Sequence, residues 1–163
     1  MNSSFEEDDS GFTLLELVLV LLLMGLIAGF TLPYVASTLD RLKLQSEVRK
    51  ISSALQFARS EAISKKAIFT FNVDIDENKY WLAMPKHNEV TQSKPIDKTV
   101  RILDYQGADE TLKEGSFMIL FYPSGNSSGG TLRFKSINDK DENIYAVIID
   151  PIIGKPKIKQ FKE

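Results

Sequence analysis

The chain has 163 residues, of which 43% are hydrophobic and 26% are charged, and its formal net charge is −2. This length and composition suit one globular domain and exclude a wholly disordered chain, a collagen-like repeat and a protein with many membrane spans. The absence of cysteine excludes disulfides, thiolate nucleophiles and cysteine-ligated metal sites. The charge is uneven, because residues 1–11 carry −4 and the remaining residues therefore carry +2.

The first predicted element is an apolar run over residues 12–36, whose only charged residue is Glu16. As a helix, these 25 residues would extend about 38 Å, which is enough to cross a hydrocarbon core of about 30 Å. The rest of the chain is too short to cover a helix that is apolar on all sides, so we expect a transmembrane helix. A cleaved secretory signal is disfavoured, because such signals begin with basic residues and this chain begins with acidic ones.

Residues 37–65 predict an amphipathic continuation of the same helix. One apolar stripe recurs at alternating spacings of four and three residues: Leu44, Val48, Ile51, Leu55, Ala58 and Ala62. Pro33 lies between the two halves, where a membrane helix tolerates proline as a kink. We therefore expect one helix from about Phe12 to Ser64, with its first half in lipid and its second half packed on a domain.

Residues 66–163 predict an antiparallel β domain, because short strands follow one another without intervening helices. The expected strands are Ile68–Ile75, Lys79–Met84, Val100–Tyr105, Phe117–Tyr122, Thr131–Phe134, Ile144–Ile149 and Lys157–Phe161. The polar residues 76–78 predict a turn, and the glycine-rich residues 123–130 predict a hairpin loop. The fold class is therefore α+β, with a long helix packed on an antiparallel sheet.

The segment that opens the apolar run, GFTLLEL from Gly11 to Leu17, resembles the processing site of type IV pilins and type II secretion pseudopilins. The resemblance implies that a prepilin peptidase removes residues 1–11 by cleaving between Gly11 and Phe12. It also implies N-methylation of Phe12 and identifies Glu16 with the glutamate that such proteins carry early in the mature helix. Pro33 falls where these helices commonly have a helix-loosening proline.

Glu16 also has a physical interpretation of its own. A carboxylate within lipid costs a few kcal/mol, so it requires a partner or must stay near the interface. Cleavage would create a cation at the Phe12 amine, and in a filament Glu16 of one subunit could neutralise the amine of a neighbour. The alternative is a carboxylate near the helix end that reaches the interface or is protonated. With the surrounding motif intact, we favour the role in filament assembly.

Three further segments resemble the minor pseudopilin H and FimT-like group: residues 57–63 at the end of the helix, the glycine-rich residues 121–131, and the turn at 150–154. This resemblance implies a minor pseudopilin at the tip of a type II secretion pseudopilus, in which a long helix packs on antiparallel sheet. Such a protein is a single-pass inner-membrane protein with its C-terminal domain in the periplasm. Its expected partners are other minor and major pseudopilins, the inner-membrane assembly platform, the prepilin peptidase and the secreted substrate.

Two alternatives remain open. The first is a FimT-like minor pilin of a type IV pilus, in pilus assembly or DNA uptake, since both machines use the same anchor. The second is an anchored binding domain that never assembles and faces the cytoplasm. That orientation follows from the positive-inside rule, because Arg41, Lys43, Arg49 and Lys50 follow the anchor while residues 1–11 have no basic residue. We give the cleavage motif precedence, since it requires the leader in the cytoplasm.

No enzyme, cofactor or metal signature is found. His87 is the single histidine and lies in a polar loop, which disfavours a catalytic triad. Asp74, Asp76 and Asn78 imitate the start of an EF-hand loop, but Lys79 occupies the position that requires glycine, so a polar turn is expected. The lysines of residues 155–159 predict a protected edge strand, and we do not expect DNA binding from their charge alone.

Overall fold

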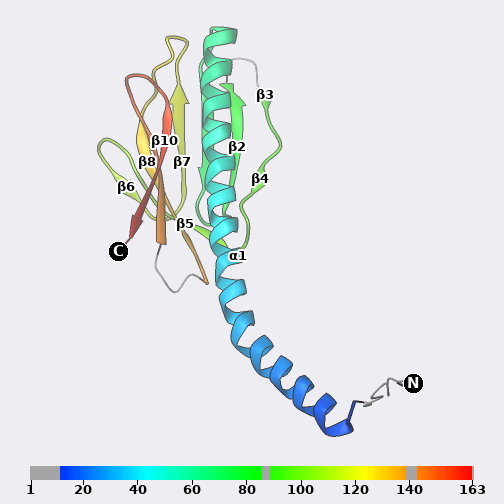
Figure 1. Ribbon diagram of the computed structural model, residues 1–163. Coiled ribbons are helices and arrows are strands. Elements are labelled where there is room, and N and C mark those ends of the chain that lie inside the picture. Colours follow the sequence, from blue (N-terminus) through cyan, green and yellow to red (C-terminus); the bar gives the residue numbers. More distant parts are fainter. Residues whose placement is uncertain (1–11, 86–88, 139–142, 163) are drawn as a thin grey trace, which may run out of the picture. The chain divides into compact units, whose positions relative to one another are not determined.

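The computed structural model describes the backbone of residues 12–85, 89–138 and 143–162, and their side chains except those of 31–37, 89 and 162. The chain begins with one helix of 52 residues, α1 (Leu14–Lys65), which confirms the predicted long helix (Figure 1). The chain divides into two units after Ala36, so each half of α1 belongs to a different unit. The leader, including Gly11, lies outside the described residues, and the leader and membrane boundaries remain predictions.

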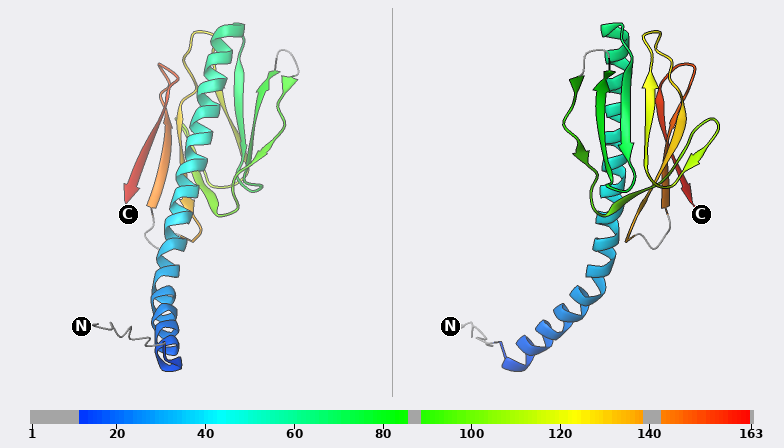
Figure 2. Two further views of the ribbon diagram at one scale, coloured as in Figure 1. Left: turned by 45° about the vertical axis from the view of Figure 1, so that its right-hand side comes forward. Right: turned by 180° about the vertical axis from the view of Figure 1, so that it is seen from behind.

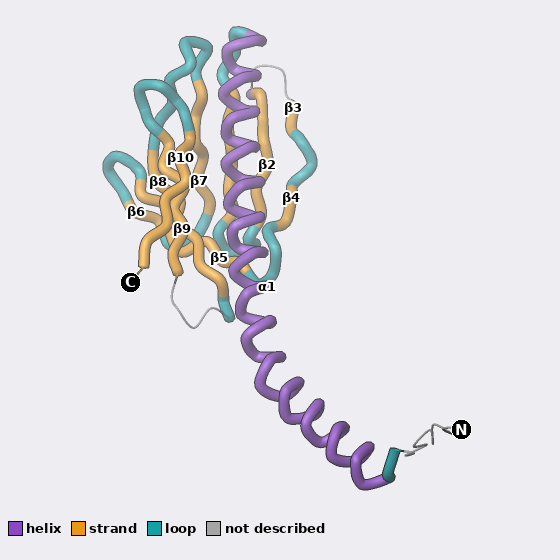
Figure 3. Tube along the Cα trace, in the orientation of Figure 1, coloured by secondary structure: helices purple, strands orange, loops and turns teal. Residues whose placement is uncertain are grey.

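Within the described residues, ten strands follow α1, and every pairing between them is antiparallel. Figure 3 shows these strands in orange beside α1. The first sheet has the order β3-β2-β1-β7, with β4 also paired to β2, and the second has the order β10-β9-β8-β5-β6. Their bounds are β1 (Phe69–Asp74), β2 (Lys79–Met84), β3 (Glu89–Val90), β4 (Lys94–Pro95), β5 (Val100–Gln106), β6 (Thr111–Leu112), β7 (Ser116–Phe121), β8 (Gly130–Ser136), β9 (Asn143–Ile149) and β10 (Pro156–Lys162). The α+β fold class is confirmed.

The hydrophobic core of the second unit lies between the second half of α1 and the two sheets, which flank it (Figure 2). All six residues of the predicted helix stripe are at most 1% exposed. The first sheet contributes alternate residues such as Phe71 and Ile119, and the second contributes Leu132 and Phe134, all fully buried. A helix whose apolar stripe lies between two inner sheet faces buries more apolar surface than one sheet alone could cover.

The division into two sheets differs from the single sheet that the sequence predicts. The glycine-rich loop folds back as a short antiparallel turn with a bridge between Phe121 and Ser127, but it does not pair β7 with β8. β7 pairs with β1 in the first sheet, whereas β8 pairs with β5 and β9 in the second. Gly129 and Gly130 have positive φ angles of 74° and 121° and bring the chain onto Tyr105 of β5. The Tyr105 hydroxyl donates to the Gly129 carbonyl at 3.0 Å, and a Cβ at Gly130 would lie 2.4 Å from the Tyr105 ring. This close packing holds the chain against β5 at the point where it enters β8, and it requires glycine at position 130.

Candidate assembly and docking surfaces

Apart from Glu16, the first half of α1 is apolar on all sides over residues 14–30, and its large side chains are exposed. Exposed fractions of these side chains range from 41% at Val20 to 80% at Leu14 and Phe30. Exposed apolar area of this extent marks an interaction surface on a folded protein. Among the described residues, no helix is found that is both long enough and apolar enough to cross a membrane.

The start of α1 has a capping arrangement that the sequence analysis missed. The Glu16 amide donates to the Thr13 hydroxyl at 3.2 Å, and the Leu17 amide donates to the Thr13 carbonyl at 3.2 Å. Thr13 and Glu16 stand in the Thr-x-x-Glu spacing of a capping box, which is a recognisable sequence signal. The Thr13 hydroxyl therefore caps the start of the helix through the backbone amide of Glu16.

The structure places the predicted N-terminal site residues on or beside this exposed segment. Phe12 precedes the helix and is 79% exposed, and Glu16 is exposed in the first turn. Pro33 lies within α1, whose helical assignment continues through residues 31–37, but its side chain is not described. The kink at Pro33 and the cleavage at Gly11 therefore stay predictions.

The three C-terminal motifs, far apart in sequence, meet at a single junction centred on Arg59. The Arg59 Nε donates to the Gly125 carbonyl at 3.0 Å and to the Ile153 carbonyl at 2.8 Å. A Cβ at Gly154, whose φ is +63°, would lie 2.3 Å from the Gly125 carbonyl oxygen. The end of α1, the glycine-rich loop and the turn at 150–154 are therefore fixed to one another by hydrogen bonds and close backbone packing.

Asp150 organises the turn at this junction. Its carboxylate accepts the amides of Ile152 and Ile153 at 2.8 and 3.1 Å, and these two bonds lower the pKa of Asp150. The Gly154 amide donates to the Asp150 carbonyl at 2.8 Å, which closes the turn. Ile152 is left 82% exposed at its tip. The predicted turn before the last strand is therefore confirmed.

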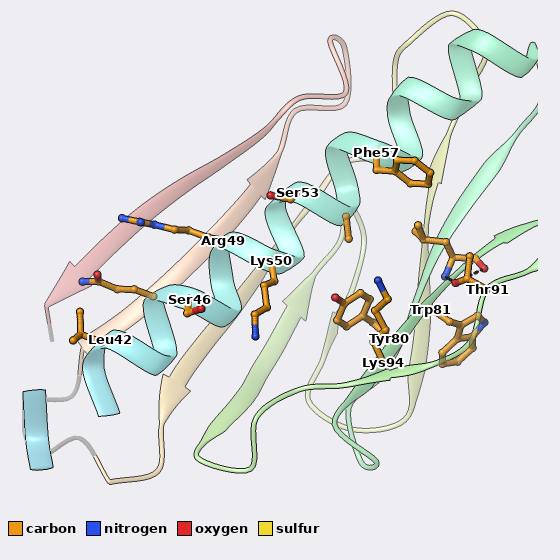
Figure 4. A pocket seen from close by; sticks show the side chains of 13 residues that line it. Leu42, Ser46, Arg49, Lys50, Ser53, Phe57, Tyr80, Trp81, Thr91 and Lys94 are labelled. Atoms are coloured by element: carbon orange, nitrogen blue, oxygen red, sulfur yellow. Dashed lines mark hydrogen bonds between the residues drawn. The ribbon is translucent and has the colours of Figure 1, made fainter. Parts of the chain in front are cut away.

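A groove of about 780 Å³ lies in the second unit between α1, β2 and the β3–β4 segment (Figure 4). Leu42 and Phe57, both about half exposed, belong to its lining, and so do Tyr80 and the cations Arg49 and Lys94. Burial of Tyr80, followed by the charge of nearby Glu47, raises the pKa of its phenol. The described lining contains no carboxylate or histidine. The cations and apolar side chains of this lining are suited to contacting acidic or apolar groups.

Lys50, which also lines this groove, is paired within the helix. Its Nζ donates to Glu47 Oε1 at 2.6 Å, and this hydrogen bond is the main reason that the pKa of Lys50 is raised. Glu47 is only 7% exposed, so the pair also satisfies a buried carboxylate. Lys50 therefore has a structural partner, and Arg49 and Lys94 supply the remaining positive charge of the lining.

The EF-hand-like residues form a polar turn, as predicted. The Asp74 carboxylate accepts the Glu77 amide at 2.9 Å, and the Asp76 carboxylate accepts the Gly115 amide at 3.0 Å. Both side chains are thus used to hold turns. Within the described ranges, no cluster of three or more histidine, cysteine or acidic residues could hold a metal ion. His87 lies outside the described residues.

The comparisons with known proteins decide the family. The profile of one family, described as Type II transport protein GspH, matches residues 47–152, which is well over half of the chain. The chain belongs to the GspH family. No curated protein matches it in sequence. The matched span of this GspH-family chain includes Arg59, Gly125 and the start of the closing turn, whereas Phe12 and Glu16 precede it.

Solved structures of two proteins share the fold of this GspH-family chain. The minor pseudopilin EpsH from the Type 2 Secretion System of Vibrio cholerae matches with a TM-score of 0.56 at 11% identity, covering 74% of this chain and 97% of EpsH. A second EpsH crystal structure gives a TM-score of 0.52 at 13% identity, with coverages of 71% and 92%. The type IV minor pilin FimU of Pseudomonas aeruginosa PAO1 gives 0.52 at 16% identity, with coverages of 75% and 90%. The pilin-like fold is therefore confirmed.

The family also limits the expected activity. GspH-family proteins are structural pseudopilins and are not known as enzymes, and membership implies interaction with other pseudopilins. Pseudopilins are membrane-anchored proteins that face the periplasm. The structure brings together the motifs of residues 57–63, 121–131 and 150–154, and it leaves the N-terminal motif on a separate, exposed segment.

Proposed function

We propose that this GspH-family chain is a minor pseudopilin at the tip of a type II secretion pseudopilus, where it helps to export folded proteins from the periplasm across the outer membrane. The family match over residues 47–152 carries this proposal. The work of such a subunit is mechanical: its helix packs in the filament, and its sheet domain contacts other minor and major pseudopilins and the secreted substrate. The inner-membrane assembly platform inserts it into the filament.

The N-terminal segment supplies the anchor and the processing site in this proposal. The prepilin peptidase removes residues 1–11 by cleaving between Gly11 and Phe12, and Phe12 is then N-methylated. Residues 12–36 span the inner membrane, with Pro33 loosening the helix, and residues 37–65 and 66–163 lie in the periplasm. The apolar surface of residues 14–30, exposed on all sides, supports an anchor that gains its contacts from lipid or from other subunits.

Glu16 sets the register between subunits in this proposal. Its carboxylate pairs with the Phe12 amine of a neighbouring subunit, so that neither charge remains alone in lipid. An uncompensated charge in a membrane helix is costly, by up to about 2.5–3.5 kcal/mol when it lies at the helix centre. Glu16 lies in the first turn, so its cost is a part of that value. Loss of the pairing is therefore expected to lower incorporation into the filament by more than about tenfold.

The test separates this role from the capping of the helix. Glu16→Gln keeps the hydrogen-bonding capacity that a capping box needs but removes the charge. We expect Glu16→Gln and Glu16→Ala to lower filament incorporation equally, by more than about tenfold, measured by cross-linking to the major pseudopilin in cells. If Glu16→Gln assembles like the wild type while Glu16→Ala fails, the residue acts only as a cap. Glu114→Gln, at an exposed carboxylate of the second unit, is the matched control and should assemble normally.

A minor pilin of a type IV pilus is the second candidate, because the FimU fold is also shared. Deletion of the gene distinguishes the two. The proposed function predicts loss of type II secretion with normal piliation, restored by the wild-type gene. Loss of pili with normal secretion would support the second candidate and contradict the first.

A further inference from the structure

The outer face of the second sheet is unusually basic. The core residues of β8 and β9, such as Leu132 and Tyr145, point toward α1, so the alternate residues point away from it. Strand register places these outward residues in three rows across β10, β9, β8 and β5. The rows are Phe161–Ile144–Lys135–Arg101, Lys159–Ala146–Arg133–Asp104 and Lys157–Ile148–Thr131–Gln106. We call these twelve residues the basic face.

One of its five cations is internally neutralised. Arg133 Nε donates to Asp104 Oδ1 at 2.8 Å, and a second guanidinium nitrogen donates to Oδ2. Asp104 is only 2% exposed, so this bidentate pair satisfies a buried carboxylate beneath the face. It also fixes the Arg133 side chain at the centre of the face. The face has four further positive charges.

Those four cations are Arg101, Lys135, Lys157 and Lys159, and all are exposed. Within the described part of the chain, none of the four forms an ion pair. Arg101 and Lys135 are direct cross-strand partners, an arrangement in which like charges destabilise a sheet. The isolated domain thus carries an electrostatic cost at this face that an acidic partner would remove.

Apolar side chains lie among these cations. Phe161 is 48% exposed, and Ile144 and Ile148 are partly exposed on the central strand of the face. The outer face of the first sheet differs, because Asp74 and Lys79 are cross-strand partners of opposite charge there. The basic face thus combines positive charge with apolar contact area over about 14 Å of sheet width, taken from the spacing of four strands. Protein interfaces have this mixture of central apolar contacts and complementary charge.

We propose that the basic face is a docking site for an acidic, partly apolar patch on another protein. Carboxylates of the partner would contact Lys135, Lys159 and their neighbours, and its apolar side chains would cover Ile144, Ile148 and Phe161. A protein is favoured because its surface can supply carboxylates and apolar side chains together, whereas the phosphate backbone of duplex DNA would leave the apolar residues between the charges uncovered. The argument for this docking site does not use the secretion role. Failure of one proposal therefore does not contradict the other.

The experiment measures binding of the full chain, held in nanodiscs of zwitterionic lipid, to two fluorescent probes. The probes are poly-L-glutamate and a random glutamate–tyrosine copolymer, followed by fluorescence anisotropy at low salt. The test variant combines Lys135→Glu with Lys159→Glu, and the first change places opposite charges on residues 101 and 135. The matched control combines Lys98→Glu with Lys113→Glu, which changes the net charge equally at exposed sites off the face.

We expect the test variant to bind the copolymer about tenfold more weakly, or worse, while the control stays within about twofold of the wild type. The copolymer should bind the wild type more tightly than poly-L-glutamate does, and Phe161→Ser should reduce that difference. Equal losses in both double variants, or no loss in either, would overturn the proposal. The proposal would also be overturned if the wild type bound duplex DNA or phosphatidylglycerol vesicles more tightly than the copolymer and the test variant lost that binding. Such a result would assign the face to nucleic acid or lipid.

Discussion

The two halves of α1 have the same backbone conformation but opposite surroundings. Over residues 14–30 the large apolar side chains are exposed on every side of the helix. Over residues 38–65, one stripe is buried completely against two sheets, while Leu42 and Phe57 off that stripe stay about half exposed. The second half has a regular apolar stripe, and this stripe packs against the sheets of the same chain. The first half is apolar without such a stripe, so its contacts must come from lipid or from another molecule.

The largest expected difference between the halves concerns removal of a leucine side chain. Leu55→Ala empties a fully buried position and should lower the free energy of unfolding of the second unit by about 3 kcal/mol. Leu22→Ala, at a position 57% exposed, should leave that free energy unchanged. Urea unfolding of the full chain in detergent, followed by near-ultraviolet circular dichroism, measures both. Equal losses of unfolding free energy in the two variants would mean that the first half of α1 also contributes to the stability of the second unit.

The Arg59 junction gives the next largest effect. Gly154→Ala places a Cβ 2.3 Å from the Gly125 carbonyl oxygen at a φ of +63°, and we expect a loss of about 2–3 kcal/mol. Gly115→Ala is the matched control, because Gly115 has a φ of +80° but nothing within 4 Å of its added Cβ. It should cost only the backbone strain, about 1 kcal/mol. If the two variants lose the same free energy of unfolding, close backbone packing at the junction does not contribute to stability.

Arg59 itself should matter less than the glycine. Arg59→Met keeps much of the aliphatic contact but leaves the carbonyls of Gly125 and Ile153 without their donor, so a loss of about 1–2 kcal/mol is expected. Arg49→Met, on the exposed surface of the same half of α1, should change stability by less than about 0.5 kcal/mol. Denaturant midpoints at constant slope report both values. A larger loss of stability for Arg49→Met than for Arg59→Met would contradict the stabilising role of the Arg59 hydrogen bonds.

The smallest expected effect concerns how steeply the melting temperature of the second unit falls as the pH is lowered. The Asp97 carboxylate accepts the hydroxyl and the amide of Thr99 at 2.7 and 2.8 Å, and these bonds lower the pKa of Asp97. A lowered pKa gives stability that is present above the unfolded value and is lost as the pH falls through the folded value. Asp97→Asn should therefore show a shallower loss of melting temperature in acid than the wild type. If the melting temperature of Asp97→Asn falls with pH as steeply as that of the wild type, Asp97 does not contribute to the loss of stability in acid.

Much of the fold was predictable, because the apolar periods of the long strands and of the second half of α1 are regular. β2 has the predicted bounds, and β1, β5, β7, β8, β9 and β10 differ from prediction by only one or two residues at an end. The two-residue strands β3, β4 and β6 were not predicted, since so few residues show no period. The division into two sheets lies in the pairing of β7 with β1 and of β8 with β5 and β9, and strand pairing is long-range information that no local pattern shows.

The candidate surfaces were predictable to different degrees. The N-terminal motif was recognisable at once because its residues are contiguous, although the Thr13–Glu16 capping box was overlooked. The Arg59 junction was visible only as three separate motifs, because residues 59, 125 and 153 meet through tertiary structure. The basic face was not predicted as a surface, because the lysines of residues 155–159 indicated only a protected edge strand. Its extent across β8 and β5 required the strand register.

The most direct test of the account is the intact mass of the protein extracted from native membranes, with and without the prepilin peptidase. The account predicts a chain that lacks residues 1–11 and carries one added methyl group at Phe12, and that stays unprocessed when the peptidase is absent. This result would also fix the leader on the cytoplasmic side, against the distribution of basic residues. An unprocessed chain beginning at Met1 in cells with active peptidase would contradict the account and favour an anchored domain that faces the cytoplasm.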